Sequence, residues 1–321
     1  MQSLSIKKNE AGQRFDKFIK KFLVNAPNSF IYKMIRKKNI TINDKKALPE
    51  QILNIDDKIS FYLSDETISK FKQNNLDISN EYVLAYEKYK NKIVVVYEDE
   101  DILLLNKPIN LLSQKADIKD ISINEIAIGY LLSNNQLNME ELATFKPSVC
   151  NRLDRNTSGL IIIGKSLQGL QELTSVIKDR SIRKFYKCLV IGNIKQANSI
   201  DGYLTKNEKN NKVAIIPANN KNMSNMDYIQ TNYTPLVQYK DTTLLEVELI
   251  TGKTHQIRAH LASIGHPIIG DMKYGNKKKN DSYKSQLLHA YKLEFPQMNK
   301  LNKLSNKIFS IEPEWINIIS E

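Results

Sequence analysis

Asp154 stands between two arginines in a segment whose residue types suit catalysis. Residues 151–160 read Asn-Arg-Leu-Asp-Arg-Asn-Thr-Ser-Gly-Leu. Positive charge within a few ångströms of a carboxylate favours its ionised form, so Arg152 and Arg155 would keep this side chain available as a nucleophile or base. An ordinary surface ion pair is the alternative. The apolar residues 160–163 that follow predict a buried strand, and active sites are often built where a rigid strand meets a loop.

Residues 251–260 form a second polar segment, Thr-Gly-Lys-Thr-His-Gln-Ile-Arg-Ala-His. Its Gly-Lys-Thr fragment resembles the end of a nucleotide-binding P-loop, but position 247, where that motif needs a glycine, is a valine. We therefore expect this loop and the helix start after it to contact a substrate phosphate or to shape the pocket, with Lys253 as a contact residue.

The four histidines of the chain do not predict a metal site. His255 and His260 are five residues apart, whereas two ligands on one face of a helix are four apart. Structural hydrogen bonding is the expected role of these two residues and of His266 and His289. Because the sequence has no assembled metal or nucleotide motif, neither a metal nor an organic cofactor is expected.

These segments resemble the RluA-type pseudouridine synthases, enzymes that isomerise uridine to pseudouridine in RNA. The family's catalytic motif reads His-Arg-Leu-Asp-x-x-Thr-Ser-Gly, and residues 151–159 match it except at Asn151, where the family usually has histidine. The resemblance continues through residues 251–260, 265–271 and 288–290, in the family's order, and covers roughly residues 91–296. It implies a reaction without redox change that needs no cofactor.

The resemblance also implies roles for four residues. Asp154 would be the catalytic nucleophile or base, and Arg258 the arginine that pairs with it, a task that suits the fork of a guanidinium. Tyr186 would be the active-site tyrosine; a phenol normally titrates near 10, so it would donate or relay a proton only if its surroundings tune it. Arg152 would enter the RNA stack in place of the extruded nucleotide. Core packing for the tyrosine and a helix surface for Arg258 are the alternatives.

Charge favours a nucleic-acid partner. Among 321 residues, 47 are Lys or Arg and 35 are Asp or Glu, which gives a formal net charge of +12, and the pI is about 9.3. Such a surface attracts polyanions through phosphate neutralisation, and Arg152, Arg155 and Lys253 would contribute to it beside the catalytic loop. A basic peripheral membrane protein would have the same net charge, but the sequence has no basic amphipathic helix with a strongly apolar opposite face and no lipidation signal.

The chain has the features of a cytosolic protein. It contains no run of about 18 apolar residues, and its N-terminus lacks the apolar region of a signal peptide. Cys150 and Cys188 are the only cysteines, too few for a disulfide framework, and we expect both to be buried apolar residues. A monomer is expected, because the core seen in the sequence pattern is complete without a partner.

Two helices are expected near the N-terminus. Apolar residues at positions 15, 18, 19 and 22, with lysines between them, predict an amphipathic helix over residues 14–23. After the break at Pro27, Asn28 or Ser29 would cap a second helix. The end of that helix carries a basic cluster, Lys33, Arg36, Lys37 and Lys38.

Short strands are expected at residues 40–42 and 58–63. Two helices followed by a small hairpin, with basic residues along one edge, resemble an S4 RNA-binding module. We therefore assign residues 1–66 to a small α+β S4-like domain whose basic cluster binds RNA; a merely solvated charged face is the alternative. Residues 67–90 are polar and without clear period, which predicts a linker that lets this domain swing.

Residues 91–321 are expected to form the catalytic domain. Strands are predicted at residues 93–96, 102–105, 186–191, 213–216, 233–239 and 245–249, and helices capped by Ser122 and Ser166 lie between them. Residues 207–230 are predicted to be a loop or hairpin excursion. Strands with irregularly interspersed helices favour an α+β fold with a mixed, largely antiparallel sheet over repeated βαβ units.

Three functions are therefore weighed. The first is a pseudouridine synthase, acting most plausibly on 23S ribosomal RNA of the large subunit, with transfer RNA as the alternative substrate. The second is a non-catalytic RNA-binding factor in ribosome assembly, which would not need the set Asp154, Tyr186 and Arg258. The third is a metal- or nucleotide-dependent hydrolase, which rests on the histidines and the Gly-Lys-Thr fragment.

Overall fold

The computed structural model describes residues 2–72, 75–207, 212–217, 226–275, 283 and 285–317. Its N-terminal unit has its own hydrophobic core. Phe15, Phe18, Ile19 and Phe22 are buried together on one face of the first helix, as the helical spacing predicts. The strands form an antiparallel sheet in the order β1-β3-β2. Its elements are β1 (Gln2–Ser5), α1 (Phe15–Phe22), α2 (Asn28–Arg36), β2 (Ile40–Ile42), β3 (Lys58–Phe61) and α3 (Asp65–Phe71).

Two details of this unit differ from the sequence-based expectation. Strand β1 lies outside the expected hairpin and pairs along β3. The cap of α2 was expected at Asn28 or Ser29, but Pro27 occupies the N-cap position and no side chain caps the helix. Proline suits that position because its fixed φ matches the extended backbone there.

Residues 67–90 were expected to form a linker. The structure instead has two helices here, α3 and α4 (Asn75–Tyr89). Tyr82 and Ala85 of α4 are buried, and α4 packs along α5 (Ile123–Ser133). A Cβ at Gly129 of α5 would lie 2.0 Å from the backbone oxygen of Tyr82, so this glycine permits the close approach. In the part of α4 whose side chains are described, tyrosines and an alanine form the side that packs on α5, and such residues give the sequence no clear apolar period.

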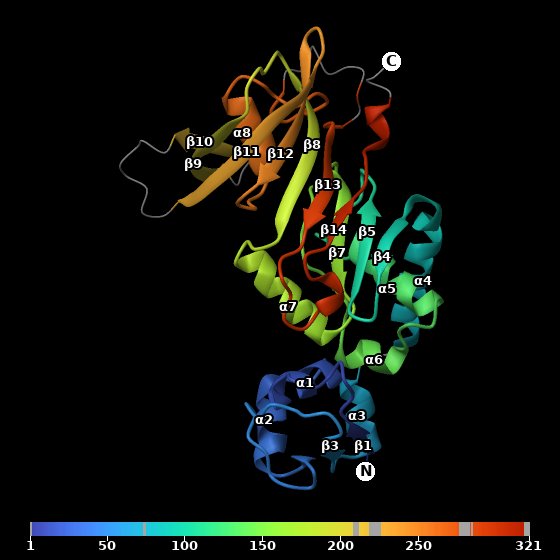
Figure 1. Ribbon diagram of the computed structural model, residues 1–321. Helices are drawn as coiled ribbons and strands as arrows, with labels where there is room; N and C mark the ends of the chain where they lie inside the picture. The colour runs from blue at the N-terminus through green and yellow to red at the C-terminus, as the bar shows by residue number, and fades with distance from the viewer. Residues whose placement is uncertain are drawn as a thin grey trace.

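Contacts join the N-terminal unit to the rest of the chain. The hydroxyl of Thr144, at the end of α6 (Met139–Thr144), is hydrogen-bonded to Glu10. Lys7 Nζ lies 3.7 Å from Glu141, and α1 packs near α6. In Figure 1 the N-terminal unit lies beneath the end of the large sheet that α6 covers.

The remainder is built on one large sheet (Figure 1), with strand order β10-β9-β11-β12-β8-β13-β7-β5-β4 and with β14 and β6 at its side. Among the described strand pairs, β13 with β7 is parallel and the others are antiparallel. The predicted α+β class with a mixed, largely antiparallel sheet is therefore confirmed.

The elements of this part alternate irregularly, which excludes repeated βαβ units. They are 3₁₀ turn Lys90–Lys92, β4 (Val94–Glu98), β5 (Ile102–Lys107), α5, α6, β6 (Ser148–Val149), β7 (Ser158–Gly164), α7 (Leu167–Lys178), β8 (Arg183–Ile191), β9 (Asn198–Asn207), β10 (Lys212–Pro217), β11 (Asp227–Gln238), β12 (Thr242–Leu249), α8 (Gln256–Ser263), β13 (Leu288–Glu294), 3₁₀ turn Asn302–Leu304, β14 (Ile308–Ser310) and 3₁₀ turn Glu314–Ile316.

Strands β5 and β7 are buried on both faces, which explains why their sequences are continuously apolar. Leu160 and Ile162 join the core on the α7 side, whereas Ile161 and Ile163 join the core on the α5 side. The predicted helix caps are confirmed: the Ser122 side chain takes part in a capping box, and Ser166 Oγ accepts a hydrogen bond from the Gly169 backbone. These two layers fix β7, the strand into which residues 151–159 lead.

The other half of the sheet carries α8 on one face. Ile257 and Leu261 of this helix pack on alternate residues of β8 and β12, among them Cys188 and Val247. The predicted excursion over residues 207–230 contains β10, which pairs with β9 as a hairpin; residues 208–211 and 218–225 lie outside the described part of the chain.

Within the described residues, no helix combines the length and the apolar character that crossing a lipid bilayer requires.

Candidate active site

A cavity of about 690 Å³ opens where the loop of Asp154 meets the start of α8. Segments that are far apart in the sequence line it: residues 112–116, residues 150–155 with Thr157, the start of β8 and residues 252–258. Six of the expected site residues share this cavity, namely Arg152, Asp154, Arg155, Tyr186, Lys253 and Arg258. The cluster of Lys33, Arg36, Lys37 and Lys38 does not line it; these side chains are exposed at the end of α2 in the N-terminal unit.

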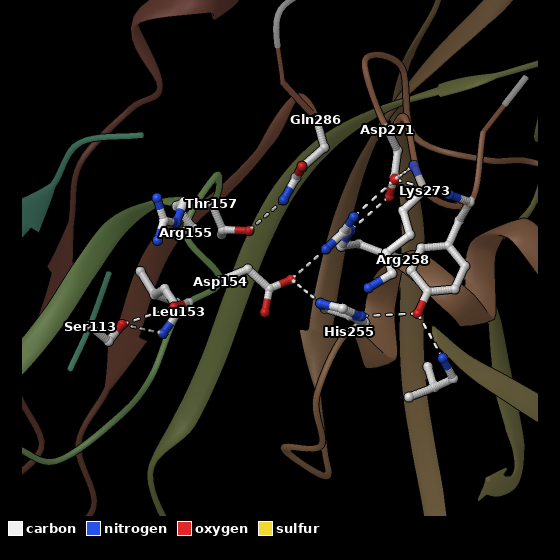
Figure 2. Close-up of polar contacts among 12 residues, drawn as sticks. Ser113, Leu153, Asp154, Arg155, Thr157, His255, Arg258, Asp271, Lys273 and Gln286 are labelled. Atoms are coloured by element: carbon white, nitrogen blue, oxygen red, sulfur yellow. Dashed lines mark hydrogen bonds and ion pairs between the residues drawn. The ribbon is translucent and has the colours of Figure 1, made fainter. Parts of the chain in front are cut away.

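Arg258, and not the arginines adjacent in sequence, holds Asp154. Arg258 Nη1 donates a hydrogen bond of 2.8 Å to Asp154 Oδ2, as Figure 2 shows. Arg155 instead lies 3.9 Å from Asp120, and Arg152 is exposed. Flanking charge predicted that Arg152 and Arg155 would hold Asp154, but the cation that contacts it is Arg258, because successive residues of a loop point in different directions.

A second carboxylate orients Arg258. Asp271 accepts hydrogen bonds of 2.7 Å from Arg258 Nε and 2.9 Å from Nη2, and it is fully buried. Burial raises the pKa of Asp271, but the hydrogen bonds and charge of Arg258 outweigh burial, so the net pKa is lowered. Burial lowers the pKa of Arg258, and the two carboxylates raise it by more. Sequence reasoning missed Asp271, although it ends the matching block 265–271.

The loop that carries Asp154 is fixed by side chains from two other segments and by one side chain of its own. Ser113 Oγ accepts from Leu153 N at 2.9 Å and donates to Leu153 O at 2.8 Å. Gln286 Nε2 donates to Thr157 Oγ1 at 3.2 Å (Figure 2). Asn151, the departure from the family motif, is buried and bonds the backbone of Leu160 and of Ile162 in β7. Asn151 therefore ties the loop to the strand.

The side chain of Lys107 also holds this loop, through the carbonyl oxygen of Arg155. Its ammonium group is completely buried and donates to the carbonyl oxygens of Pro108 at 2.9 Å, Leu111 at 2.8 Å and Arg155 at 3.2 Å. Burial lowers the pKa of Lys107 to about 7, and the charge of Asp154 acts in the opposite direction. The three acceptors match the three N–H groups of the charged form. Lys107 is the last residue of β5, and nothing in the sequence marks a lysine at the end of an apolar strand as a donor to buried carbonyl oxygens.

We expect Lys107→Met to lower the free energy of unfolding by about 2–3 kcal/mol, because the substitution removes the donor from the carbonyl oxygens of Pro108 and Leu111; the Arg155 oxygen still accepts from the Leu111 backbone. Urea unfolding measures the change. Lys303→Met is a suitable comparison, since that lysine pairs with Glu100 at 2.7 Å on an exposed surface, where an ion pair contributes about 0–1 kcal/mol. Equal losses in the two variants would contradict the proposed role of Lys107.

Tyr186 lies in β8 at the cavity wall, with almost all of its side chain buried. Burial raises the pKa of its phenol, and the negative charge of Asp154 raises it further. The environment therefore keeps Tyr186 protonated at neutral pH. It can donate a hydrogen bond or a proton, but it is not tuned to act as a base.

His255 lies at the start of α8 with a left-handed backbone, φ 54°. Its Nε2 is 3.7 Å from Asp154 Oδ2, and its Nδ1 is 3.0 Å from the hydroxyl of Tyr274. Burial lowers the pKa of His255; the charge of Asp154 opposes this, and that of Arg258 adds to it. His255 was expected to have only a structural role, although it lies in the matching block 251–260.

The other three histidines have partners within the fold. His260 Nδ1 is 2.8 Å from Thr231 Oγ1, His266 Nδ1 is 2.8 Å from the Ile191 carbonyl, and His289 bonds Ser158 and the Ile311 carbonyl. Burial lowers the pKa of His260 and of His289 to about 4. In the described ranges, no group of three His, Cys, Asp or Glu side chains is placed to hold a metal ion.

The two cysteines differ in burial. Cys188 is fully buried in the core of the sheet, as expected, whereas Cys150 is half-buried and lines the cavity. Burial raises the pKa of the Cys150 thiol to about 12, so this group stays a thiol at neutral pH and is a poor nucleophile.

Basic side chains surround the mouth of the cavity. Arg152 and Arg155 are exposed, and Lys253 Nζ lies 2.6 Å from Asp227 Oδ1 at the surface. Arg180 and Lys184 also line the cavity, although sequence reasoning missed them. Burial, with the nearby charge of Arg180, lowers the pKa of Lys184. This arrangement can bind a phosphate backbone around a carboxylate that stays accessible.

The known proteins that this chain resembles are described as RNA pseudouridine synthases. The sequence profile described as RNA pseudouridylate synthase matches residues 101–263. A Mycoplasma capricolum protein named as an uncharacterized RNA pseudouridine synthase is 33% identical over 99% of each chain. The ribosomal large subunit pseudouridine synthase C of Vibrio parahaemolyticus is 29% identical over 92% of this chain and 88% of its own.

Solved structures agree at the level of the fold. Human RNA pseudouridylate synthase domain containing 4 aligns with a TM-score of 0.58 and 19% identity over 74% of this chain and 94% of its own. Human RNA pseudouridylate synthase domain containing 1 aligns with a TM-score of 0.54 and 20% identity over 70% and 84%.

Proposed function

Because the chain belongs to the RNA pseudouridylate synthase family and is an isomerase that acts on RNA, we propose that it isomerises uridines of large-subunit ribosomal RNA, with Asp154 as the catalytic nucleophile or base. The single observation that carries the catalytic assignment is the Arg258 to Asp154 hydrogen bond of 2.8 Å at the floor of a cationic cavity. Arg258 has the role of orienting the carboxylate in this proposal.

Asp154 has the geometry that such a role needs. Its side chain is about one-quarter exposed, so an extruded nucleoside can reach it. Arg258 and His255 both face Oδ2, and among the described residues no hydrogen bond reaches Oδ1. We assign Oδ1 as the reacting oxygen, because its lone pairs are free. The carboxylate then either bonds to a carbon of the substrate or removes the 2′ proton.

Isomerisation needs the glycosidic bond from C1′ to N1 to break, the uracil to rotate, and a new bond to form from C1′ to C5. The proton on C5 must then leave, and N1 must gain one. Tyr186 is proposed as a proton donor or relay, since burial keeps it protonated. Extrusion of the nucleotide costs a few kcal/mol, and Arg152 at the exposed rim is proposed to offset part of this cost by occupying the vacated stack.

We expect Tyr186→Phe to lower the single-turnover rate by about 10²-fold, because it removes the hydroxyl but keeps the ring that packs in β8. RNA affinity and the thermal midpoint should stay close to those of the unmodified protein. Tyr233→Phe is a matched control, since Tyr233 is also buried in the same core but does not line the cavity. If both variants kept full activity, Tyr186 would have no role in proton movement.

The ribosomal target rests on two further points. Relatives named as large-subunit synthases match over most of this chain, and the N-terminal unit presents Lys33, Arg36, Lys37 and Lys38 on an exposed edge. We propose that residues 1–66 act as an S4-like module that binds ribosomal RNA through this basic cluster. The charge of the cluster alone would suit transfer RNA equally well.

The direct test is incubation of the purified protein with large-subunit ribosomal RNA and with transfer RNA, followed by site-by-site mapping of pseudouridine. We expect new pseudouridines in ribosomal RNA. Modification of transfer RNA alone would replace the proposed substrate, and absence of any product with either RNA and with total cellular RNA would overturn the proposed activity.

A further inference from the structure

A chain of polar contacts, two hydrogen bonds and one longer contact, leads from the β9–β10 hairpin to the proposed catalytic carboxylate. The backbone N–H of Val213 in β10 donates to the Tyr274 hydroxyl at 2.9 Å. The same hydroxyl lies 3.0 Å from His255 Nδ1, and His255 Nε2 lies 3.7 Å from Asp154 Oδ2. Figure 2 shows His255 between these two contacts, beside Arg258.

The hydrogen-bond inventory of Tyr274 fixes the direction of this chain. A phenol has one proton to donate, and the Val213 N–H already uses the hydroxyl as an acceptor. If His255 Nδ1 also donated to it, the phenolic proton would have no acceptor among the described residues. The arrangement that pairs every group has Tyr274 donating to Nδ1, so the proton of a neutral imidazole is then on Nε2.

We propose that His255 is a positioning residue, held by Tyr274 as the neutral Nε2–H tautomer so that it donates toward Asp154 Oδ2. Together with Arg258 it fixes Oδ2 and leaves Oδ1 for reaction. The contact of 3.7 Å is longer than a hydrogen bond, and such contacts often shorten when substrate is bound. This inference rests on the proposed role of Asp154.

The charges that face His255 are consistent with a neutral ring. Burial, the largest influence, and the charges of Arg258 and Lys273 disfavour an imidazolium, whereas Asp154 and Asp271 favour it; the net result is a lowered pKa of His255. The ring of Tyr274 meets that of His255 edge to face, with centroids 5.6 Å apart. The centroid of the Tyr274 ring also lies 5.2 Å from Arg258 Cζ. The side chain of Tyr274 therefore contacts both His255 and Arg258, the two residues that face Asp154.

The tautomer is measured directly by long-range ¹H–¹⁵N spectra of the imidazole nitrogens at pH 7.5, with the His255 signals assigned by their loss in His255→Gln. We expect a protonated Nε2 and an unprotonated Nδ1, and a change in that pattern in Tyr274→Phe, which keeps the ring and removes the hydroxyl. A protonated Nδ1 in the unmodified protein, as the other tautomer or as imidazolium, would overturn the inference. This readout does not depend on turnover, so it separates the tautomer from the proposed function.

Kinetics test whether the Nε2 donor acts on Asp154. Gln and Met have equal length and no branch at Cβ, so both tolerate φ 54° at position 255 similarly. We expect His255→Met to lower the single-turnover rate about 10²-fold, with the Kd for RNA unchanged, and His255→Gln, which restores an N–H donor, to recover at least a tenth of the original rate. Equal rates of the two variants would overturn the positioning role, even if the protein modifies RNA as proposed.

Discussion

Asp154→Asn is expected to lower the single-turnover rate of pseudouridine formation by more than about 10³-fold, while the Kd for RNA changes by no more than about twofold. The amide has nearly the same shape as the carboxylate and can still accept the hydrogen bond from Arg258 Nη1. It has no negative charge, however, and cannot attack a carbon or take up a proton. The loss should therefore fall on the chemical step and not on binding.

The control for this prediction is Asp227→Asn, which makes the same change in charge near the cavity mouth. Asp227 is exposed and pairs with Lys253 at 2.6 Å, so its neutralisation should leave turnover within about threefold of the unmodified protein. Rates are measured with excess protein over a labelled ribosomal RNA fragment, and binding is measured separately at fixed salt, because phosphate contacts are salt-dependent. Turnover by Asp154→Asn at more than a tenth of the original rate would contradict the catalytic assignment.

The sequence was sufficient to predict much of the fold, because its patterns are local. Apolar runs placed β4, β5, β7 and β10 within two residues of their observed bounds, and Ser122 and Ser166 marked two helix starts. Strands β8, β11 and β12 begin three to six residues before their predicted starts, and β6, β9, β13 and β14 were not predicted. The sequence predicted a linker over residues 67–90 where the structure has α3 and α4, and the reason for this error is also local. Helix α4 buries tyrosines and an alanine against α5, and its apolar face is too weak to give a clear helical period.

The site was predicted as a set of residues but not as a network. Motif blocks named Asp154, Tyr186 and Arg258, yet the residues that hold them come from elsewhere: Lys107 ends β5, Ser113 lies in the following loop, and Asp271 and Tyr274 follow α8. These partners lie 13 to 48 positions from the groups they fix. Such pairings depend on tertiary packing, which neither composition nor periodicity encodes.

Substitution of Arg258, which pairs with Asp271, is expected to have the second large effect, on stability as well as on activity. We expect Arg258→Met to lower the free energy of unfolding by about 3–5 kcal/mol, because it leaves the buried carboxylate of Asp271 without its cation. The same substitution removes the donor to Asp154, so turnover should be lost in any protein that remains folded. Urea unfolding and single-turnover rates measure the two effects.

A double variant separates the two roles of the guanidinium. In Arg258→Met with Asp271→Asn the buried charge is gone, while the amide oxygen can still accept from the backbone N–H of Lys273 or Tyr274. Part of the lost stability should therefore return, but turnover should not, because Asp154 still lacks the hydrogen bond from Arg258. Recovery of activity together with stability would mean that Arg258 only supports the fold.

The pH dependence of stability gives an independent check on the same pair. Because the pKa of Asp271 is lower in the folded protein than its ordinary value of about 3.9, the unfolded chain binds more protons between those two values, and stability rises with pH there. The contribution is complete above the ordinary value and is lost as the pH falls through the lowered one. The double variant has no carboxyl group at position 271, so its unfolding free energy should fall less steeply in acid than that of the unmodified protein. An identical acid slope in both proteins would show that other carboxylates, and not Asp271, determine acid stability.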